Sequence, residues 1–69
     1  MNNWETTEVW YASEWDVWMV TAWTAEGAQV GESEAYNLKV DAVHTAQGYL
    51  DSDRCEVVEV YTKAGNLQK

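Results

Sequence analysis

The alternation of hydrophobic and polar positions predicts three strands in the first half of the chain. Residues 6–12 are rich in β-forming side chains, and residues 28–32 form a shorter, more polar strand. Between them, residues 15–24 give the strongest strand pattern, with mostly apolar side chains on both faces. One face carries Trp15, Val17, Met19, Thr21 and Trp23, and the other carries Trp18, Val20 and Ala22. We therefore expect this strand to be central and covered on both sides.

The hydrophobic period changes in the second half, where residues 36–50 predict an amphipathic helix. Its apolar stripe has successive spacings of four, three, four and three residues and comprises Tyr36, Val40, Val43, Gln47 and Leu50, widened by Ala42, Ala46 and Tyr49. Ser33 and Asn37 are candidate N-caps of this helix. A valine-rich strand follows over residues 55–62, and a turn over residues 63–66 leads to a last residue or two of pairing through Leu67.

The order strand, strand, strand, helix, strand predicts an α+β fold in a single domain over residues 1–69. Because the helix has one apolar stripe, we expect it to pack on one face of a small antiparallel sheet of three to four strands. The pattern leaves open whether the last strand pairs with the first or the second. The other face of the sheet, expected to carry Trp18, would need cover from loops, from the N-terminal segment, or from a second copy of the protein.

Two segments of five residues, 23–27 and 61–65, resemble each other. In each, an aromatic residue and a Thr leave a valine-containing strand and enter a turn that ends in Gly. We interpret the similarity as shared turn chemistry rather than as a repeat, with Gly27 supplying a positive φ in the first of the two turns.

The composition changes the expected core, because the chain has five Trp and four Tyr but no Phe. The chain also has no Ile, so the indole rings must fill the core. We expect Trp15 and Trp23 to be buried there. Trp4 and Trp10 lie instead in a polar stretch, which favours exposure of at least one of them at an interface.

The net charge of the chain limits the kind of molecule that its surface can bind. Twelve Asp and Glu oppose four Lys and Arg, a formal net charge of −8. Such a surface repels nucleic acid and anionic membranes, and it attracts basic protein surfaces. An aromatic platform for single-stranded nucleic acid needs a basic groove, which this chain does not supply, so we expect no direct binding of nucleic acid.

The sequence carries no catalytic constellation, so we expect neither an enzyme nor a bound cofactor or metal. His44 has no ligand or orienting group at helical spacing, and one His with one Cys makes no zinc site. The Asp51–Asp53 segment is only a fragment of a calcium loop. Cys55 is expected to be a small buried hydrophobe. The lone Cys, the absence of a leader pattern at residues 1–5 and the lack of a long apolar run favour a cytoplasmic protein.

The acids form three pairs two residues apart, namely Glu14 with Asp16, Glu32 with Glu34, and Asp51 with Asp53. In an extended chain such side chains share a face about 6.5–7 Å apart, similar to successive phosphates of a nucleic-acid strand. Glu32 and Glu34 precede the predicted helix, where the helix dipole favours negative charge. Asp51 and Asp53 follow the helix, where negative charge is disfavoured. The residues predicted to bind the partner are therefore Asp51, Asp53, Glu14, Asp16, Glu56, Glu59, Trp4 and Trp10.

Small size, acidic charge and a helix on a short sheet together resemble phage-encoded inhibitors of the anti-CRISPR kind, and other DNA mimics such as anti-restriction proteins. The resemblance spans the whole chain but includes no motif, so it transfers no residue roles. It implies an inhibitor in the host-cell cytoplasm that docks on a basic, nucleic-acid-binding surface of a defence complex, such as a CRISPR effector, through DNA mimicry. The alternative is a structural or accessory homodimer whose acidity serves solubility alone.

Overall fold

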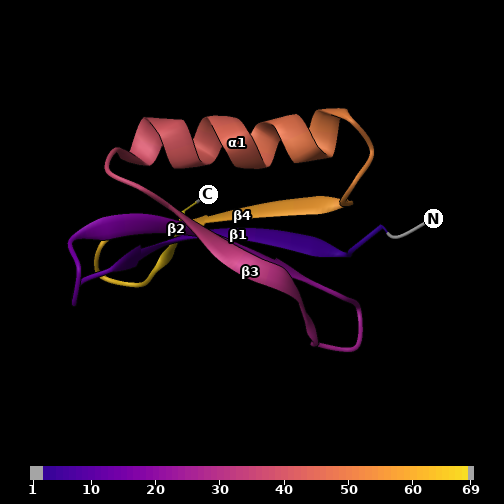
Figure 1. Ribbon diagram of the computed structural model, residues 1–69, viewed down its shortest axis with the longest axis horizontal. Coiled ribbons are helices and arrows are strands. Elements are labelled where there is room, and N and C mark those ends of the chain that lie inside the picture. Colours follow the sequence, from indigo (N-terminus) through magenta and orange to yellow (C-terminus); the bar gives the residue numbers. More distant parts are fainter. Residues whose placement is uncertain (1–2, 69) are drawn as a thin grey trace.

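The computed structural model describes residues 3–68, and within them one helix packs on a five-stranded sheet (Figure 1). The elements are β1 (Thr6–Ala12), β2 (Val17–Trp23), β3 (Gln29–Tyr36), α1 (Lys39–Asp51), β4 (Val57–Tyr61) and β5 (Leu67–Gln68). The predicted α+β class, with the helix on one face of the sheet, is confirmed. Met1 and Asn2, two of the residues used for the leader expectation, lie outside the described residues.

The strand order is β3-β2-β1-β4-β5, so β1 lies in the middle of the sheet. β1 pairs with β2 antiparallel and with β4 parallel, which places β4 beside the first strand rather than the second. The sheet is thus mixed, where only antiparallel pairs were predicted, and β5 is the short pairing expected at Leu67. The parallel pair follows from the connectivity. β3 runs in the direction of β1, and α1 returns the chain to the end where β3 began, so β4 repeats that direction.

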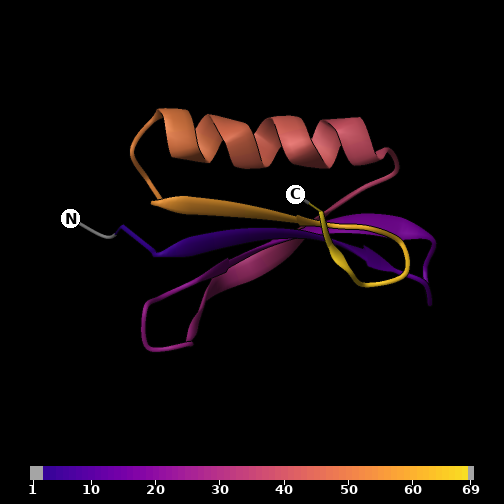
Figure 2. The ribbon, with the colours of Figure 1, turned by 180° about the vertical axis from the view of Figure 1, so that it is seen from behind.

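The core lies between the helix and the sheet and consists of Val9, Trp18, Val20, Ala42 and Ala46. Val9 and Val20 are direct partners across β1 and β2, so the helix covers the face of β2 that carries Trp18. The prediction that β2 is covered on both sides is wrong, because no described helix or strand lies over the opposite face (Figures 1 and 2). Trp15, at 68% exposure, and the partly exposed Trp23 therefore do not belong to the core.

The helix starts later than the pattern predicted. β3 continues to Tyr36, and Leu38 occupies the N-cap position without a side-chain hydrogen bond, so neither Ser33 nor Asn37 caps the helix. The buried residues of α1 are Ala42 and Ala46, both at 0% exposure, whereas Val40 is 67% exposed. Small side chains on the inner face let the helix approach the sheet closely. Ala42 and Ala46 lie on this face as predicted, whereas Gln47 of the predicted stripe is exposed like Val40.

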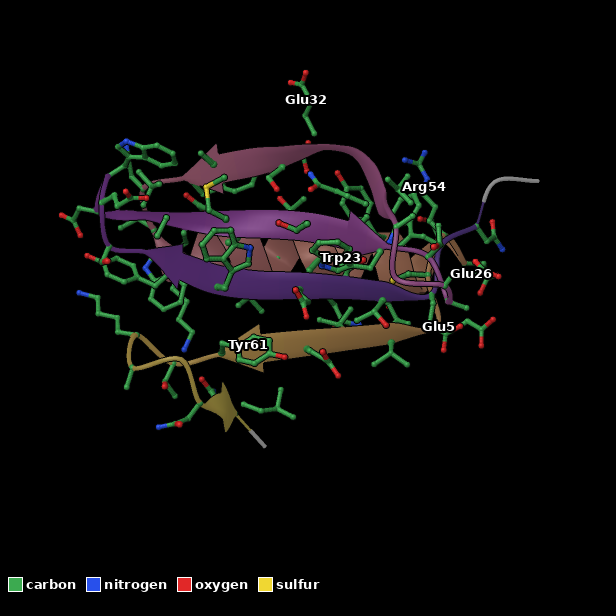
Figure 3. The ribbon with its side chains drawn as sticks, turned by 90° about the horizontal axis from the view of Figure 1, so that it is seen from below. Glu5, Trp23, Glu26, Glu32, Arg54 and Tyr61 are labelled. Carbon is green, nitrogen blue, oxygen red and sulfur yellow. The ribbon has the colours of Figure 1, made fainter. Side chains whose placement is uncertain are left out.

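β3 is longer than predicted because it contains a bulge. Val20 pairs with Glu34 and Ala22 pairs with Val30, so the segment 31–33 lies opposite Thr21 alone. Gly31 has a φ of 65°, a left-handed conformation that glycine adopts without steric cost. The bulge lies on an edge strand, and Glu32 projects from that edge away from the sheet (Figure 3). A bulge and an outward charge both disfavour pairing of this edge with another chain.

The two similar turns have the same hydrogen bonds, which confirms the shared turn chemistry. The Thr24 amide donates to Ala28 O at 2.8 Å, and the Thr62 amide donates to Asn66 O at the same distance. The hydroxyl of each Thr accepts a hydrogen bond from the amide four residues later. The glycine that closes each turn has a φ of 90°. The second turn joins β4 to β5 at the sheet edge opposite β3 (Figure 2).

Candidate functional site

Glu14, Trp15 and Asp16 lie together at the exposed turn between β1 and β2. Asp16 has a φ of 52° and accepts a hydrogen bond from the Tyr11 hydroxyl. This hydrogen bond, together with burial and the charge of Asp16, raises the pKa of the Tyr11 phenol. Both acids are exposed, and so is Trp15, which was expected in the core.

Asp51 and Asp53 have a structural role at the end of α1, although the helix dipole disfavours negative charge there. The Gln47 side-chain amide donates to Asp51 Oδ1 at 3.0 Å. Asp53 has a φ of 62°, and its amide donates to Leu50 O at 3.1 Å. Asp tolerates the left-handed conformation that ends many helices, so this residue terminates α1.

Glu32 and Glu34 lie in β3, so the helix dipole does not explain them as predicted. The Tyr49 hydroxyl donates to Glu34 Oε1 at 2.6 Å and ties the helix to the edge strand. Both acids border a hollow of about 160 Å³ that is also lined by Trp4, Tyr49 and Arg54. The ring of Trp4 packs edge-on against Tyr49 with centroids 5.4 Å apart, and its Nε1 donates to Thr7 Oγ1 at 2.7 Å. Trp4 is thus anchored within the fold.

The strongest candidate site is the face of the sheet away from the helix, which we call the open face. Strand alternation places on it Glu8 and Trp10 of β1, Met19, Thr21 and Trp23 of β2, and Glu59 and Tyr61 of β4. Six of these seven side chains are partly exposed, and only Thr21 is buried. Figure 3 views this face with the helix behind the sheet and labels Trp23 and Tyr61 on it. Of the predicted partner-binding residues, it holds Trp10 and Glu59, while Glu56 is exposed just before β4.

Two indole rings point toward the same row of the open face. Trp10 Nε1 donates to Thr21 Oγ1 at 2.9 Å, and Trp23 Nε1 donates to Glu8 Oε1 at 2.8 Å. Glu8 and Thr21 are direct partners across β1 and β2. The rings therefore lie over the sheet from opposite ends and bury the Thr21 hydroxyl, which also lies 2.6 Å from Ser33 Oγ.

Two carboxylates lie next to each other in that row. Glu8 and Glu59 are direct partners in the parallel β1–β4 pair, on strands separated by about 4.8 Å. Like charges directly opposite across strands are destabilising. The Tyr61 hydroxyl donates to Glu59 Oε1 at 3.2 Å. Burial raises the pKa of the Tyr61 phenol, and the negative charges of Glu59 and Glu8 raise it further.

The basic side chains of residues 3–68 come from the start of α1, the turn after α1 and the β4–β5 turn. Each lies over an aromatic ring: Lys39 Nζ is 5.0 Å from the Trp18 ring centroid, Arg54 Cζ is 5.9 Å from that of Tyr49, and Lys63 Nζ is 4.8 Å from that of Tyr11. Those rings belong to the helix and to the strand face beneath it. The open face thus combines aromatic rings and carboxylates and has no described cation to neutralise them.

Five open-face residues were missed as candidates: Glu8, Met19, Thr21, Trp23 and Tyr61. The alternation did place Met19 and Trp23 on one face of β2, but both faces of that strand are apolar. Trp23 was therefore assigned to the core. Glu8 and Tyr61 alternate in phase with Trp10 and Glu59, a signal that becomes useful once the pairing of β1 with β4 is known.

Neither a metal-holding group nor a membrane-spanning helix is found among the described residues. Among residues 3–68, no three His, Cys, Asp or Glu side chains are grouped so that they could hold a metal ion. His44 is exposed on α1, and Cys55 is buried at 4% exposure. No helix in this part of the chain is long and apolar enough to cross a membrane. The chain matches no protein-family model, no curated protein and no solved structure.

The bond between Tyr49 and Glu34 makes stability sensitive to alkaline pH. The hydrogen bond to Glu34, with burial and the charge of that carboxylate, raises the pKa of Tyr49 from 10.0 to about 12. The stability contributed by the neutral phenol is therefore complete below pH 10 and is lost as the pH rises toward 12. We expect urea unfolding to show a steeper loss of stability across this window in the native sequence than in Tyr49→Phe. Equal slopes for the two proteins would contradict this assignment.

Proposed function

We propose that this protein is an acidic binding protein that docks on a basic, nucleic-acid-binding surface of another protein. The observation that carries the proposal is the placement of Glu8 and Glu59 side by side among the aromatic rings of the open face. The three basic side chains of residues 3–68 lie over the rings of Trp18, Tyr49 and Tyr11, and within those residues no ion pair neutralises Glu8 or Glu59. A molecule with a net charge of −8 is steered toward positive surfaces, and aromatic residues are the usual anchors once contact is made.

The finer proposal is an inhibitor of a host defence complex, such as a CRISPR effector, acting in the cytoplasm by occupying a surface made for DNA. Its support is the resemblance in size, charge and architecture to anti-CRISPR proteins. The exposed acids of the β1–β2 turn, Glu14 and Asp16, add negative charge beside the exposed Trp15. Displacing a nucleic acid in this way would recover the salt-dependent free energy that phosphates otherwise supply.

The test is binding to a purified type I CRISPR effector complex with and without target DNA, at low and high salt. We expect a stoichiometric complex that target DNA prevents and that weakens steeply as salt increases. Lysozyme, a basic protein that is not an effector, is the control for charge attraction alone. Simultaneous binding of DNA and inhibitor, or equal binding to lysozyme, would contradict the proposed function.

A second candidate function is self-association as a structural homodimer, which the uncovered aromatic face favours. A sheet face with partly exposed Trp10 and Trp23 can pair with a copy of itself. Such a dimer would bring two copies of Glu8 and Glu59 into one interface, where unpaired charges are costly to desolvate. Sedimentation at micromolar concentration distinguishes the two functions, because the acidic binding protein is expected to be monomeric.

A further inference from the structure

We infer that the open face binds an arginine side chain of the partner, with the guanidinium between Trp10 and Trp23 and against Glu8 and Glu59. The inference rests on the proposed function insofar as the partner is basic. It adds the place of contact and the chemical group that is recognised. It also moves the expected contact away from Asp51 and Asp53, which terminate the helix.

The spacing along the strands defines the site. Trp23 pairs with Thr6, and Trp10 lies four residues further along β1. At about 3.3 Å per residue, the two Trp rows are about 13 Å apart, with the Glu8–Glu59 row midway between them. Both indole N–H groups point inward to this middle row. The rings therefore border a strip of sheet on which the two carboxylates lie side by side.

The carboxylates are held in place by the rings that flank them. Trp23 Nε1 binds Glu8 Oε1, and the Tyr61 hydroxyl binds Glu59 Oε1. The Tyr61 hydroxyl also lies near the Glu8 carboxylate, and an ionised carboxylate offers about four lone-pair sites, so each acid can accept further hydrogen bonds from an incoming donor. Both carboxylates are only partly exposed, and this lowers the dielectric screening around them.

Among residues 3–68 no cation lies between Glu8 and Glu59, and a bound cation would offset the repulsion of these two like charges. Glu8 and Glu59 repel each other directly across β1 and β4, in a molecule that already carries −8. A residue pair that opposes local stability is a common mark of a functional surface. Binding of one positive group between the carboxylates would turn this repulsion into two attractive contacts.

The chemistry of the strip favours a guanidinium over an ammonium. A guanidinium is planar, stacks on aromatic rings, and directs several N–H donors to two carboxylates at once. An ammonium is a compact and strongly hydrated charge that gains less from flat rings. A second copy of this chain is a poorer partner, because its own open face would bring two further carboxylates against Glu8 and Glu59.

The direct test uses a blocked tetra-arginine peptide as the probe, followed by two-dimensional NMR of the full chain. We expect saturable shifts of the Trp10 and Trp23 indole N–H signals, with weaker binding of tetralysine. A tetra-citrulline peptide, which has the same shape without the charge, should cause no shift. Equal binding of tetralysine and tetra-arginine, or shifts confined to Arg54 and Tyr49, would overturn the inference.

The matched variants are Glu8→Gln/Glu59→Gln and Glu26→Gln/Glu32→Gln. Both remove two negative charges, but Glu26 and Glu32 lie away from the open face (Figure 3). Gln keeps an acceptor oxygen for Trp23 and Tyr61. We expect the open-face pair to weaken peptide binding about tenfold or more and the control pair far less. The open-face pair should also raise the melting temperature by a few degrees, because it removes a repulsion.

Equal weakening by both variants would show attraction by net charge alone and would overturn the inference. So would dimerisation that becomes stronger in Glu8→Gln/Glu59→Gln, because it would make a second copy the occupant. The effector experiment separates the two proposals. If the open-face variant competes with DNA as well as the native sequence does, the inference fails while the proposed function stands. If the peptide binds at Glu8 and Glu59 but no effector complex forms, the reverse holds.

Discussion

Trp18→Ala is expected to leave most of the protein unfolded at 25 °C. Trp18 is 7% exposed and is the largest side chain in the cluster between the sheet and the helix. Removal of a buried Trp costs about 3–5 kcal/mol, and a chain of 69 residues has about 3–10 kcal/mol of total stability. The substitution also removes the ring beneath Lys39 and the contact of Tyr11 with it.

The control is Trp15→Ala, which makes the same chemical change at a residue that is 68% exposed. We expect its free energy of unfolding to stay within about 0.5 kcal/mol of the native value. Urea denaturation followed by far-ultraviolet circular dichroism measures both variants. If Trp15→Ala destabilised the protein as much as Trp18→Ala, the placement of the core under the helix would be wrong.

Ala46→Leu is expected to destabilise the protein by about 1–3 kcal/mol, because the site has no room for three more carbon atoms. Ala46 and Ala42 are both at 0% exposure on the inner face of α1. A larger side chain there would lift the helix from Val9 and Val20, which belong to the same cluster. Thermal unfolding should show a melting temperature lower by several degrees.

The control for this second prediction is Gln47→Leu. Gln47 follows Ala46 in the sequence but lies on the exposed side of α1. The substitution adds an apolar side chain to the same helix without entering the core, so we expect a change within about 0.5 kcal/mol. The sequence pattern placed Gln47 on the buried stripe. A stabilising Gln47→Leu together with a neutral Ala46→Leu would therefore favour a stripe centred on Gln47 over the observed one, which is centred on Ala42 and Ala46.

The elements could be predicted well because they depend on local chemistry. The β-forming runs and the change of period at the helix identified five of the six elements, and the sixth, β5, was expected as a residue or two of pairing at Leu67. The two Thr-to-Gly turns were recognised from five residues each, since a glycine at positive φ and a Thr hydroxyl need no distant partner.

The start of the helix could not be predicted in the same way. Tyr36 fits a helical stripe by its spacing, but the ladder between β2 and β3 extends to it and pairs it with Trp18. Ser33 and Asn37 suit an N-cap by residue type, yet the Ser33 hydroxyl lies against Thr21 across the bulge. Pairing with a strand that is far away in sequence overrode the local preference in this segment.

The candidate site depended still more on long-range pairing. Glu8 and Glu59 are separated by most of the chain, and only the parallel pair between β1 and β4 brings them together. Trp23 and Trp18 are equally hydrophobic, so residue type alone did not show which of them faces the helix. The choice was made by the packing of Val20 against Val9 and of α1 over that side.

The sequence by itself determined the helix-and-sheet composition, the two glycine turns and the acidic charge. These properties follow from side-chain chemistry and short periods, which neighbouring residues set. The tertiary structure alone decided which face of the sheet the helix covers and which residues form the open face. Those outcomes depend on the register and direction of strands distant in sequence, because one face of a two-sided apolar strand is buried only when another element packs on it.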